Sequence, residues 1–429
     1  MIKLYFKQAL AQLRQQPIIS LVSVLGTALA IFLIMLVVMI QQVKVAPFSP
    51  ESNRDRFLHF AFMSISNKEW GDGTSNGPMS EQTAKACFKS LATPEAVTVY
   101  CCAAITTPAS VPGSPAVSID LRQTDNAFWQ VFDFAFVAGK PYDQATFDSG
   151  RPVAVLTESV SRALFGTTEA VGREFLLNHA PYTVVGVVKD VSTLASSSYG
   201  QVWIPYTSTD LAWDTWSDGH MGMMSVTILA HSRDDFESIR EEISKVQQQY
   251  NNLLAEGGYK LVYRNRPYDQ EKQAIAFAAN WEPDVKAARR QRITIFVILL
   301  LVPAINLSSM TQSRLRQRVS EIGVRRAFGS TRTEMMGQIV MENLIVTLFA
   351  GLAGLFFSIL FAYLGNSFLF QDYGATLNPP EVNASILLQP STFMYALLFC
   401  FILNLLSTGL PAWKASRTSI VNALGGRTH

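Results

Sequence analysis

The stretch that decides the fold is PIISLVSVLGTALAIFLIMLVVMI, residues 17–40, which contains no charged side chain. About 20 consecutive apolar residues cross the hydrocarbon core of a bilayer, so this run is long enough to span one. A cleaved signal peptide has a shorter apolar core and a small-residue cleavage site, whereas this run continues into QQVKVAPF. We therefore expect an uncleaved transmembrane helix over residues 17–41, preceded by a cytoplasmic amphipathic segment, residues 1–16.

Three further apolar runs lie in the last third of the 429-residue chain. They predict transmembrane helices over residues 291–312, 338–366 and 391–413. Residues 42–290 have the mixed polarity of a domain exposed to water. The predicted fold class is therefore an α-helical membrane protein with four transmembrane helices, one plus three, and a large α+β extracytoplasmic domain inserted between the first and second.

Basic residues in the short flanks predict the orientation of these spans. They precede the first span, crowd into residues 313–337 and follow the last span, and they are absent from residues 367–390. By the positive-inside rule both termini, the segment 313–337 and the tail 414–429 are cytoplasmic, and the connection 367–390 is an external loop. We expect a multi-pass protein of the inner (plasma) membrane. The net charge of +2 gives no indication of nucleic-acid binding, because topology accounts for the basic residues.

The predicted outer domain, residues 42–290, has a strand, helix, strand pattern at each end. Between these two β-α-β units lies a strand-rich subdomain, about residues 111–223, punctuated by Pro, Gly and Asp. The residues that follow, from Tyr268 onward, are good helix formers and run into the second span. They predict a helical stalk, which Pro283 should interrupt or bend.

Motifs for catalysis are not found. A phosphate-binding loop needs Gly-Lys followed by Ser or Thr, but the one Gly-Lys pair is followed by Pro141. The five histidines lack the spacing of metal ligands. We therefore expect no enzyme activity, no metal site and no cofactor in this chain.

Three of the four cysteines fall in the predicted outer domain. In an oxidising compartment Cys87 can form a disulfide with Cys101 or with Cys102. The alternative is that all three are ordinary packed thiols.

Polar residues inside the predicted spans need partners, because burying them in lipid costs free energy. Asn306 and Asn404 are expected to form hydrogen bonds between helices, the alternative being contact with a substrate. Glu342, near the cytoplasmic start of its span, either reaches the interface or pairs with an arginine of the preceding loop.

The loop SEIGVRRAFGSTRTEM, residues 320–335, carries local helix signals. Glu321 and Arg325 are spaced i, i+4 in the favourable acid-before-base order. Gly329 supplies a helix stop, and the T-x-x-E form of Thr331 to Glu334 is that of a capping box. A short helix, a break and a second, capped helix are predicted.

The apolar side chains of that short helix need a surface to cover them. Ile322, Val324, Ala327 and Phe328 stand beside two arginines suited to binding carboxylates. A helix that docks a cytoplasmic partner accounts for both features. The alternative is an amphipathic helix that rests on anionic lipid.

The chain resembles the MacB/FtsX-type permeases of ATP-binding-cassette transporters along nearly its whole length. Residues 320–344 are similar to that family's coupling segment, and PAWKASRTSIVNAL is similar to its terminal helix and tail. RPVAVLTESVSRALFG and YTVVGVVKDV are similar to its periplasmic core domain. In the family's macrolide exporters the ATPase is fused to the permease, whereas this chain is expected to be a stand-alone permease subunit.

The resemblance implies a permease that forms a homodimer or a paralogous heterodimer and docks a separate cytoplasmic ATPase, which binds ATP and Mg. Family members are thought to work by mechanotransmission, in which ATP-driven movements in the cytoplasm move the outer domain. The residues that match the family's coupling motif, and that would lie at the ATPase interface, are Glu321, Ile322, Gly323, Arg325, Arg326, Ala327 and Gly329.

The resemblance leaves the cargo open. Export of a periplasmic drug, peptide or other small substrate, with a periplasmic adaptor and an outer-membrane channel as partners, is the favoured function. The alternatives are a lipoprotein-releasing permease and an FtsX-like regulatory scaffold that controls a periplasmic enzyme.

Overall fold

The computed structural model describes residues 17–209, 214–370, 387 and 390–417, and the protein divides into two compact units. The helical unit comprises Met1–Val43, Lys286–Leu369 and Asn383–His429. The sheet unit comprises Lys44–Val285 and Phe370–Val382. The predicted segments 1–16 and most of 367–390 and 414–429 lie outside the described residues.

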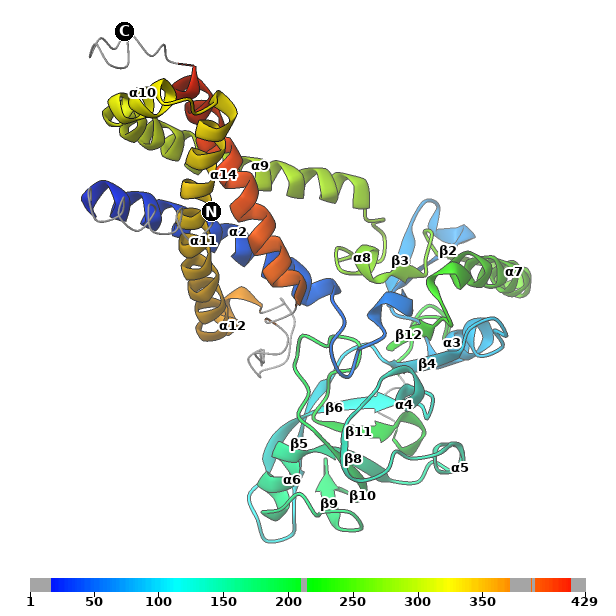
Figure 1. The fold of residues 1–429 in the computed structure, drawn as a ribbon. Helices are drawn as coiled ribbons and strands as arrows, with labels where there is room; N and C mark the ends of the chain where they lie inside the picture. The colour runs from blue at the N-terminus through cyan, green and yellow to red at the C-terminus, as the bar shows by residue number, and fades with distance from the viewer. Residues whose placement is uncertain (1–16, 210–213, 371–386, 388–389, 418–429) are drawn as a thin grey trace. The chain divides into compact units, whose positions relative to one another are not determined.

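The helical unit is built on four long helices (Figure 1). Within the described residues these four are long and apolar enough to cross a membrane. Each covers one of the four predicted spans, although two begin well before the apolar run that predicted them. The helices of this unit are α2 (Pro17–Val45), α9 (Val285–Gln317), α10 (Val319–Ala327), α11 (Arg332–Leu364), α12 (Asn366–Leu369) and α14 (Pro390–Ser416).

Two glycines allow α11 to approach its neighbours closely. A Cβ at Gly351 would collide with the Sγ of Cys400 in α14. A Cβ at Gly354 would stand 2.5 Å from the carbonyl oxygen of Ala28 in α2. Small residues of this kind let helix backbones pack together where lipid supplies no hydrophobic driving force between helices.

The sheet unit contains one large sheet of eleven strands and one small sheet, β13-β2-β3. The strands are β1 (Phe57–Phe60), β2 (Met63–Asn67), β3 (Thr74–Gly77), β4 (Ala96–Cys101), β5 (Ile105–Ser110), β6 (Val117–Thr124), β7 (Phe136–Gly139), β8 (Val153–Thr157), β9 (Glu174–Leu177), β10 (Ala180–Val188), β11 (Val202–Pro205), β12 (Met224–Leu229), β13 (Tyr259–Val262) and β14 (Tyr268–Asp269). The helices are α3 (Glu81–Phe88), α4 (Phe128–Val131), α5 (Gln144–Asp148), α6 (Glu158–Phe165), α7 (Phe236–Leu254) and α8 (Gln270–Gln273).

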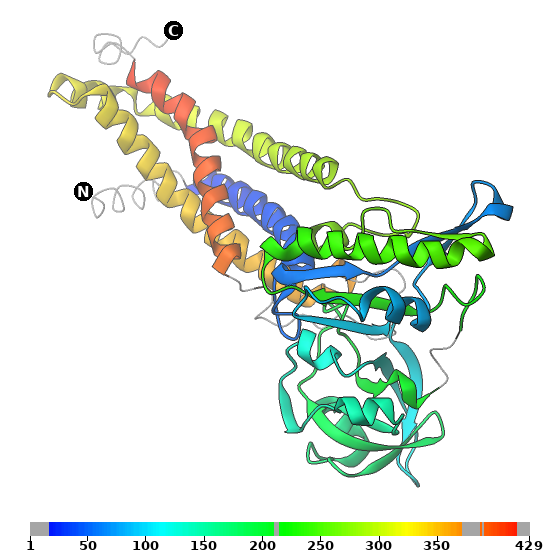
Figure 2. The ribbon, with the colours of Figure 1, turned by 90° about the vertical axis from the view of Figure 1, so that its right-hand side faces the viewer.

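One half of the large sheet has the order β4-β12-β1-β14, and its neighbouring strands are antiparallel. Strands β1 and β4 are joined through α3, and β12 and β14 through α7, so the two β-α-β units interleave. Side chains of α3 and α7 share one hydrophobic core with β1, β4 and β12, and Figure 2 shows α7 lying along these strands.

The structure corrects the two predicted β-α-β units in detail. Where the pattern at the start of the domain predicts one strand before the helix, residues 56–65 contain two strands, β1 and β2, which belong to different sheets. The strand predicted after α7, residues 259–265, forms β13 of the small sheet, and β14 takes its place in the large one. The helical stalk is wrong between α8 and Pro283, because α9 begins only at Val285.

The inserted subdomain is a closed barrel (Figure 1). Its strands pair in the cyclic order β5-β6-β11-β8-β10-β9 and back to β5. Buried aliphatic side chains fill its interior, among them Leu121, Leu156 and Val202. Because β5 begins at Ile105 and β11 ends at Pro205, the barrel starts earlier and ends earlier than the predicted insert, 111–223.

A fully buried ion pair fixes the segment that follows α2 to this barrel. We call Glu51 and Arg54 the outer pair: Arg54 Nε lies 2.7 Å from Glu51 Oε2, and both side chains are 1% exposed. Glu51 Oε1 accepts hydrogen bonds from the backbone N–H groups of Ser197 and Ser198 in the β10–β11 connection. Arg54 donates to the carbonyl oxygens of Ala46 and Leu194.

The cysteines of the sheet unit are free thiols in the structure, which contains neither a Cys87–Cys101 nor a Cys87–Cys102 disulfide. Cys87 lies on the buried face of α3, in the core, where burial raises the pKa of its thiol to about 11. A thiol of this kind is chemically quiet, since the reactive species is the thiolate. The packed-thiol alternative describes the arrangement of Cys87 in the structure.

Candidate coupling site

The segment between α9 and α11 folds as its local signals predict. Helix α10 runs from Val319 to Ala327, and Gly329 then adopts a φ of 99°, which favours glycine. The capping box is present: the Glu334 backbone N–H donates to Thr331 Oγ1, and the Thr331 N–H donates to Glu334 Oε2 at 2.8 Å. Helix, break and capped helix are thus confirmed.

Five side chains then close a ring of hydrogen bonds, which we call the coupling ring. Arg318 Nε donates to Glu321 at 2.9 Å, and Arg325 donates to the other oxygen of Glu321 at 2.7 Å. The second terminal nitrogen of Arg325 donates to Gln338 Oε1 at 2.9 Å.

The ring closes through α11. Gln338 Nε2 donates to Glu342 Oε1 at 2.8 Å, and Arg318 donates to Glu342 Oε2 at 2.9 Å. Because Arg318 precedes α10 and Glu342 lies in α11, the ring holds the two helices together. Glu342 is 2% exposed, so of the two alternatives left open for it the structure has the one in which it pairs with an arginine.

The electrostatics of the ring favour its charged form. Hydrogen bonding to Arg318 lowers the pKa of Glu321, against an opposing effect of burial. Burial lowers the pKa of Arg318, but the hydrogen bonds to Glu321 and Glu342 outweigh it and the net pKa is raised. For Arg318 and Glu321 the hydrogen bonds thus favour the charged form of each group.

Apolar packing around Ile322 adds to the hydrogen bonds that hold α10 in place. Ile322 is 5% exposed and packs with Leu315, Met335, Ile339 and Ala412. Gly323 is also buried. These two predicted coupling residues therefore lie inside the helical unit.

The two adjacent arginines bind within the chain. Arg325 belongs to the ring, and Arg326 donates to the backbone carbonyl of Ser416 near the end of α14. Both side chains are partly exposed. The two arginines thus join α10 to two other helices. The sequence patterns pointed only to a partner outside the chain and did not reveal these contacts within it.

The exposed part of the segment is its C-terminal end. Phe328 is 88% exposed and Val324 is 43% exposed, and Ala327 and Gly329 are exposed as well. A phenylalanine this exposed leaves apolar surface in contact with water, and burying that surface is favourable. The segment thus exposes apolar side chains at its C-terminal end, while hydrogen bonds hold the rest of it to the helical unit.

Arg318 and Gln338 were not among the residues predicted for this site. Arg318 stands three residues before Glu321, and Gln338 four residues before Glu342, spacings that place side chains on one helix face. Those spacings could have predicted each of the two local pairs from the sequence. The pair of Arg318 and Glu342 spans 24 residues and has no local signal.

The intramembrane asparagines have different outcomes. Asn404 of α14 donates from Nδ2 to the Val340 carbonyl of α11 at 3.3 Å, an interhelical hydrogen bond as expected. Asn306 falls within α9, and its side chain lies outside the described part of the structure. Over the described residues no group of three His, Cys, Asp or Glu side chains is placed to hold a metal ion.

Two family profiles match the sequence. The MacB-like periplasmic core domain matches residues 20–246, which is more than half of the chain. The FtsX-like permease C-terminal region matches residues 293–420. The second match contains the coupling ring.

Curated relatives include an ABC transporter permease, YknZ, of Bacillus subtilis strain 168, which is 23% identical over 70% of this chain and 68% of its own length. The macrolide export ATP-binding/permease protein MacB of Escherichia coli O157:H7 is 24% identical over 72% of this chain and 46% of its own. The pyoverdine export protein PvdT of Pseudomonas savastanoi pv. phaseolicola is 25% identical over 70% and 42%. The chain thus spans less than half the length of these two exporters.

Solved structures with a resembling region include the extracellular domain of YknZ from Gram-positive bacteria, which is 16% identical, with a TM-score of 0.34. That match covers 48% of this chain and 99% of the domain. The periplasmic region of MacB from Actinobacillus actinomycetemcomitans is 17% identical, with a TM-score of 0.33, and covers 47% and 88%.

Proposed function

The chain belongs to the MacB/FtsX family of ABC transporter permeases, and from that premise we propose that it couples a separate cytoplasmic ATPase to movements of its sheet unit. The observation that carries the proposal is the coupling segment itself. Its apolar end is exposed, while its base is tied to α11 through the coupling ring and to α14 through Arg326.

The exposed end is the contact we assign to the ATPase. Phe328, with Val324 and Ala327 beside it, offers apolar area that a partner surface can cover, and an exposed aromatic side chain is the usual anchor of such a contact. Glu321, Arg325 and Arg326 remain partly exposed at the rim, where charges guide the approach of a partner. Ile322 and Gly323 support the helix from inside.

The ring and the buried Ile322 give this contact a route into the long helices. Because Arg325 of α10 and Arg318 just before it are both hydrogen-bonded to α11, a displacement of α10 displaces the start of α11. This supports mechanotransmission, in which ATP and Mg are held by the partner and the chain itself moves. We further propose that the four long helices span the inner membrane with both termini cytoplasmic, and that the protein acts with a second permease subunit.

Export of a periplasmic drug, peptide or other small substrate is the activity we favour, because two of the relatives are named as exporters. A periplasmic adaptor and an outer-membrane channel would complete such a system. Lipoprotein release and regulation of a periplasmic enzyme require the same ATPase contact, so they are distinguished by the outer partner that purifies with the protein from the native envelope.

The test of the ATPase contact is a Phe328→Ala variant of the full chain, purified from its native membrane. We expect the Mg-dependent ATPase activity that purifies with the protein to fall about thirtyfold or more, since interface anchors of this type contribute about 2 kcal/mol or more. Phe368→Ala is a matched control, because Phe368 is 85% exposed but lies in α12, beyond the opposite end of α11. Equal ATPase recovery from both variants would refute the assignment of Phe328.

A further inference from the structure

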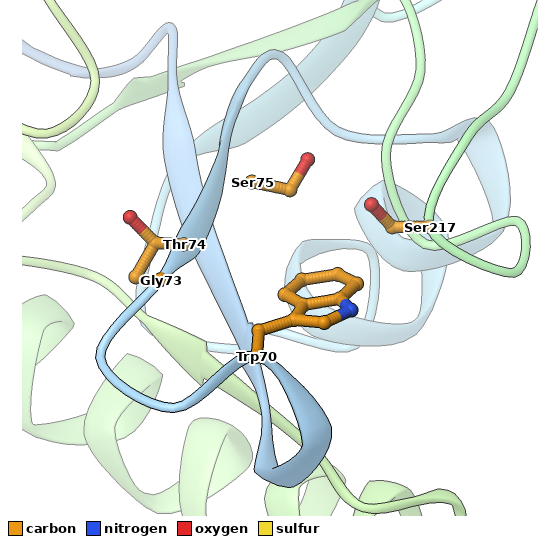
Figure 3. Close-up of a pocket in the computed structure, with 5 residues that line it drawn as sticks. All are labelled: Trp70, Gly73, Thr74, Ser75 and Ser217. Atoms are coloured by element: carbon orange, nitrogen blue, oxygen red, sulfur yellow. The ribbon is translucent and has the colours of Figure 1, made fainter.

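A shallow pocket of about 330 Å³ lies in the sheet unit, apart from every residue considered so far. Figure 3 shows its five lining residues, which we call the aromatic pocket: Trp70, Gly73, Thr74, Ser75 and Ser217. None of the five carries a charge. Trp70 ends the short helix before β3, Thr74 and Ser75 lie in β3, and Ser217 lies in a turn far along the chain.

The indole of Trp70 forms the base of the pocket, and a neighbouring tyrosine fixes its orientation. Trp70 is 40% exposed, and its ring meets that of Tyr259 edge to face at 5.7 Å. The hydroxyl of Tyr259 donates to Asp218 Oδ2 at 2.6 Å, which ties this support to the turn that carries Ser217. An exposed, oriented indole face of this kind is suited to stacking on a flat ligand.

The opposite wall is held in a costly backbone conformation. Ser217 and Asp218 have φ values of 53° and 54°, a left-handed region that costs a residue other than glycine about 1–2 kcal/mol. The paired backbone hydrogen bonds between Trp216 and Met221, each 3.1 Å, fix this turn. Backbone strain that the surroundings enforce is characteristic of binding sites.

The Thr74 hydroxyl is hydrogen-bonded to Asn76, but that of Ser75 leaves hydrogen-bonding capacity for a ligand. Trp216 Nε1 donates to Ser75 Oγ at 3.1 Å, so that bond uses a lone pair of Ser75 and not its hydroxyl proton. In Figure 3 Ser75 and Ser217 lie beside the indole of Trp70, each with its hydroxyl group drawn. The site therefore combines one aromatic face with hydroxyls that both donate and accept.

These features fit a particular ligand chemistry. A charged ligand would lose hydration without meeting an opposite charge among the lining residues, which costs free energy. A purely apolar ligand would leave the hydroxyls without partners. A sugar ring satisfies both conditions, because it has a C–H face that stacks on an indole and a rim of hydroxyls. We propose that the aromatic pocket binds a neutral, hydroxyl-rich sugar ring.

The test uses the full chain in lipid nanodiscs, with N,N′-diacetylchitobiose as the probe and saturation-transfer-difference NMR as the measurement. The expected result is saturable binding that Trp70→Ala weakens about tenfold, since that variant removes the stacking face. Trp281→Ala is a matched control, because Trp281 is 41% exposed in the same unit and does not line the pocket. Its affinity should equal that of the unmodified protein.

Ser217→Gly is the second variant, because glycine adopts the left-handed conformation without strain and the change removes the hydroxymethyl side chain. It should fold normally and bind the disaccharide at least about threefold more weakly. Absence of saturable binding up to about 20 mM, full binding by Trp70→Ala, or Trp70-dependent binding of tetramethylammonium but not of sugar would each overturn the proposal. None of these outcomes bears on the ATPase contact.

Discussion

The outer pair and the coupling ring both pair carboxylates with guanidinium groups, but water reaches the two sets to different extents. Glu51 and Arg54 are each 1% exposed, whereas Arg318, Glu321 and Arg325 are 28%, 42% and 34% exposed. Removing one partner of a buried ion pair leaves the other charge buried without compensation, which is strongly destabilising. A pair at the surface can exchange its partners for water at little cost. We therefore expect the outer pair to keep one arrangement, whereas the exposed side chains of the ring can exchange their hydrogen-bond partners.

Glu51→Gln should produce the largest effect, because it leaves the Arg54 guanidinium buried beside a neutral amide. We expect the free energy of unfolding of the sheet unit to fall by about 3–5 kcal/mol. Urea titration of the full chain in detergent, followed by tryptophan fluorescence, measures it. Trp203 is a suitable reporter, since it is buried and donates to the Ser198 carbonyl within the same network.

Glu95→Gln is the control for that variant. Glu95 also pairs with an arginine, Arg56, at 2.8 Å, but is 42% exposed. Its loss should change stability by less than about 1 kcal/mol. Equal effects of the two substitutions would remove the contrast between buried and exposed pairs.

Glu342→Gln tests the one ring member that is as buried as the outer pair. The amide cannot accept from both Arg318 and Gln338 as the carboxylate does, so we expect a loss of about 1–3 kcal/mol. The melting temperature of the purified protein in detergent reports it. Arg316→Gln removes an exposed charge just before the ring and should leave the melting temperature unchanged.

Glu321→Gln should have a smaller effect, below about 1 kcal/mol, because water screens this carboxylate. The effect should also depend on pH. The pKa of Glu321 is lower in the folded protein than in the unfolded chain, so its contribution is complete above the unfolded value of about 4.3. It is lost as the pH falls through the lowered folded pKa. The melting temperatures of the variant and the unmodified protein should therefore differ at pH 7 and converge below pH 4, and a difference that persists at low pH would contradict this role.

The smallest effect is expected at the capping box, where no buried charge is involved. Thr331→Ala removes the side-chain acceptor for the Glu334 N–H and should destabilise the start of α11 by about 1 kcal/mol. Faster hydrogen exchange of that amide would show it. Thr333→Ala, which does not cap the helix, should leave the exchange rate nearly unchanged, and equal rates in both variants would argue against capping.

What the sequence could predict is the part of the structure written in short spacings. The four long helices follow from apolar runs, and the capping box follows from two residues three positions apart. Asn404 could be assigned an interhelical hydrogen bond because lipid leaves a polar group few other choices, although the acceptor at Val340 was not predictable.

What it could not predict depends on distant pairings. Strand β6 pairs with β11 although four strands lie between them in the sequence, and β2 pairs with β13 from the far end of the sheet unit's sequence. The coupling segment shows the same limit at smaller scale. Arg325 and Arg326 looked like ligands for a partner, but Gln338 and the Ser416 carbonyl bind them first. A single sequence does not specify contacts between separate elements.

The closed barrel has a mechanical consequence. A sheet with free edges can be peeled, because its outermost strand detaches without disturbing the rest. Each strand of the ring β5-β6-β11-β8-β10-β9 is held on both sides. A pull on Ser198, where the outer pair grips the β10–β11 connection, therefore loads several ladders at once. The barrel therefore resists such a pull as one body, since no single strand can yield before its neighbours.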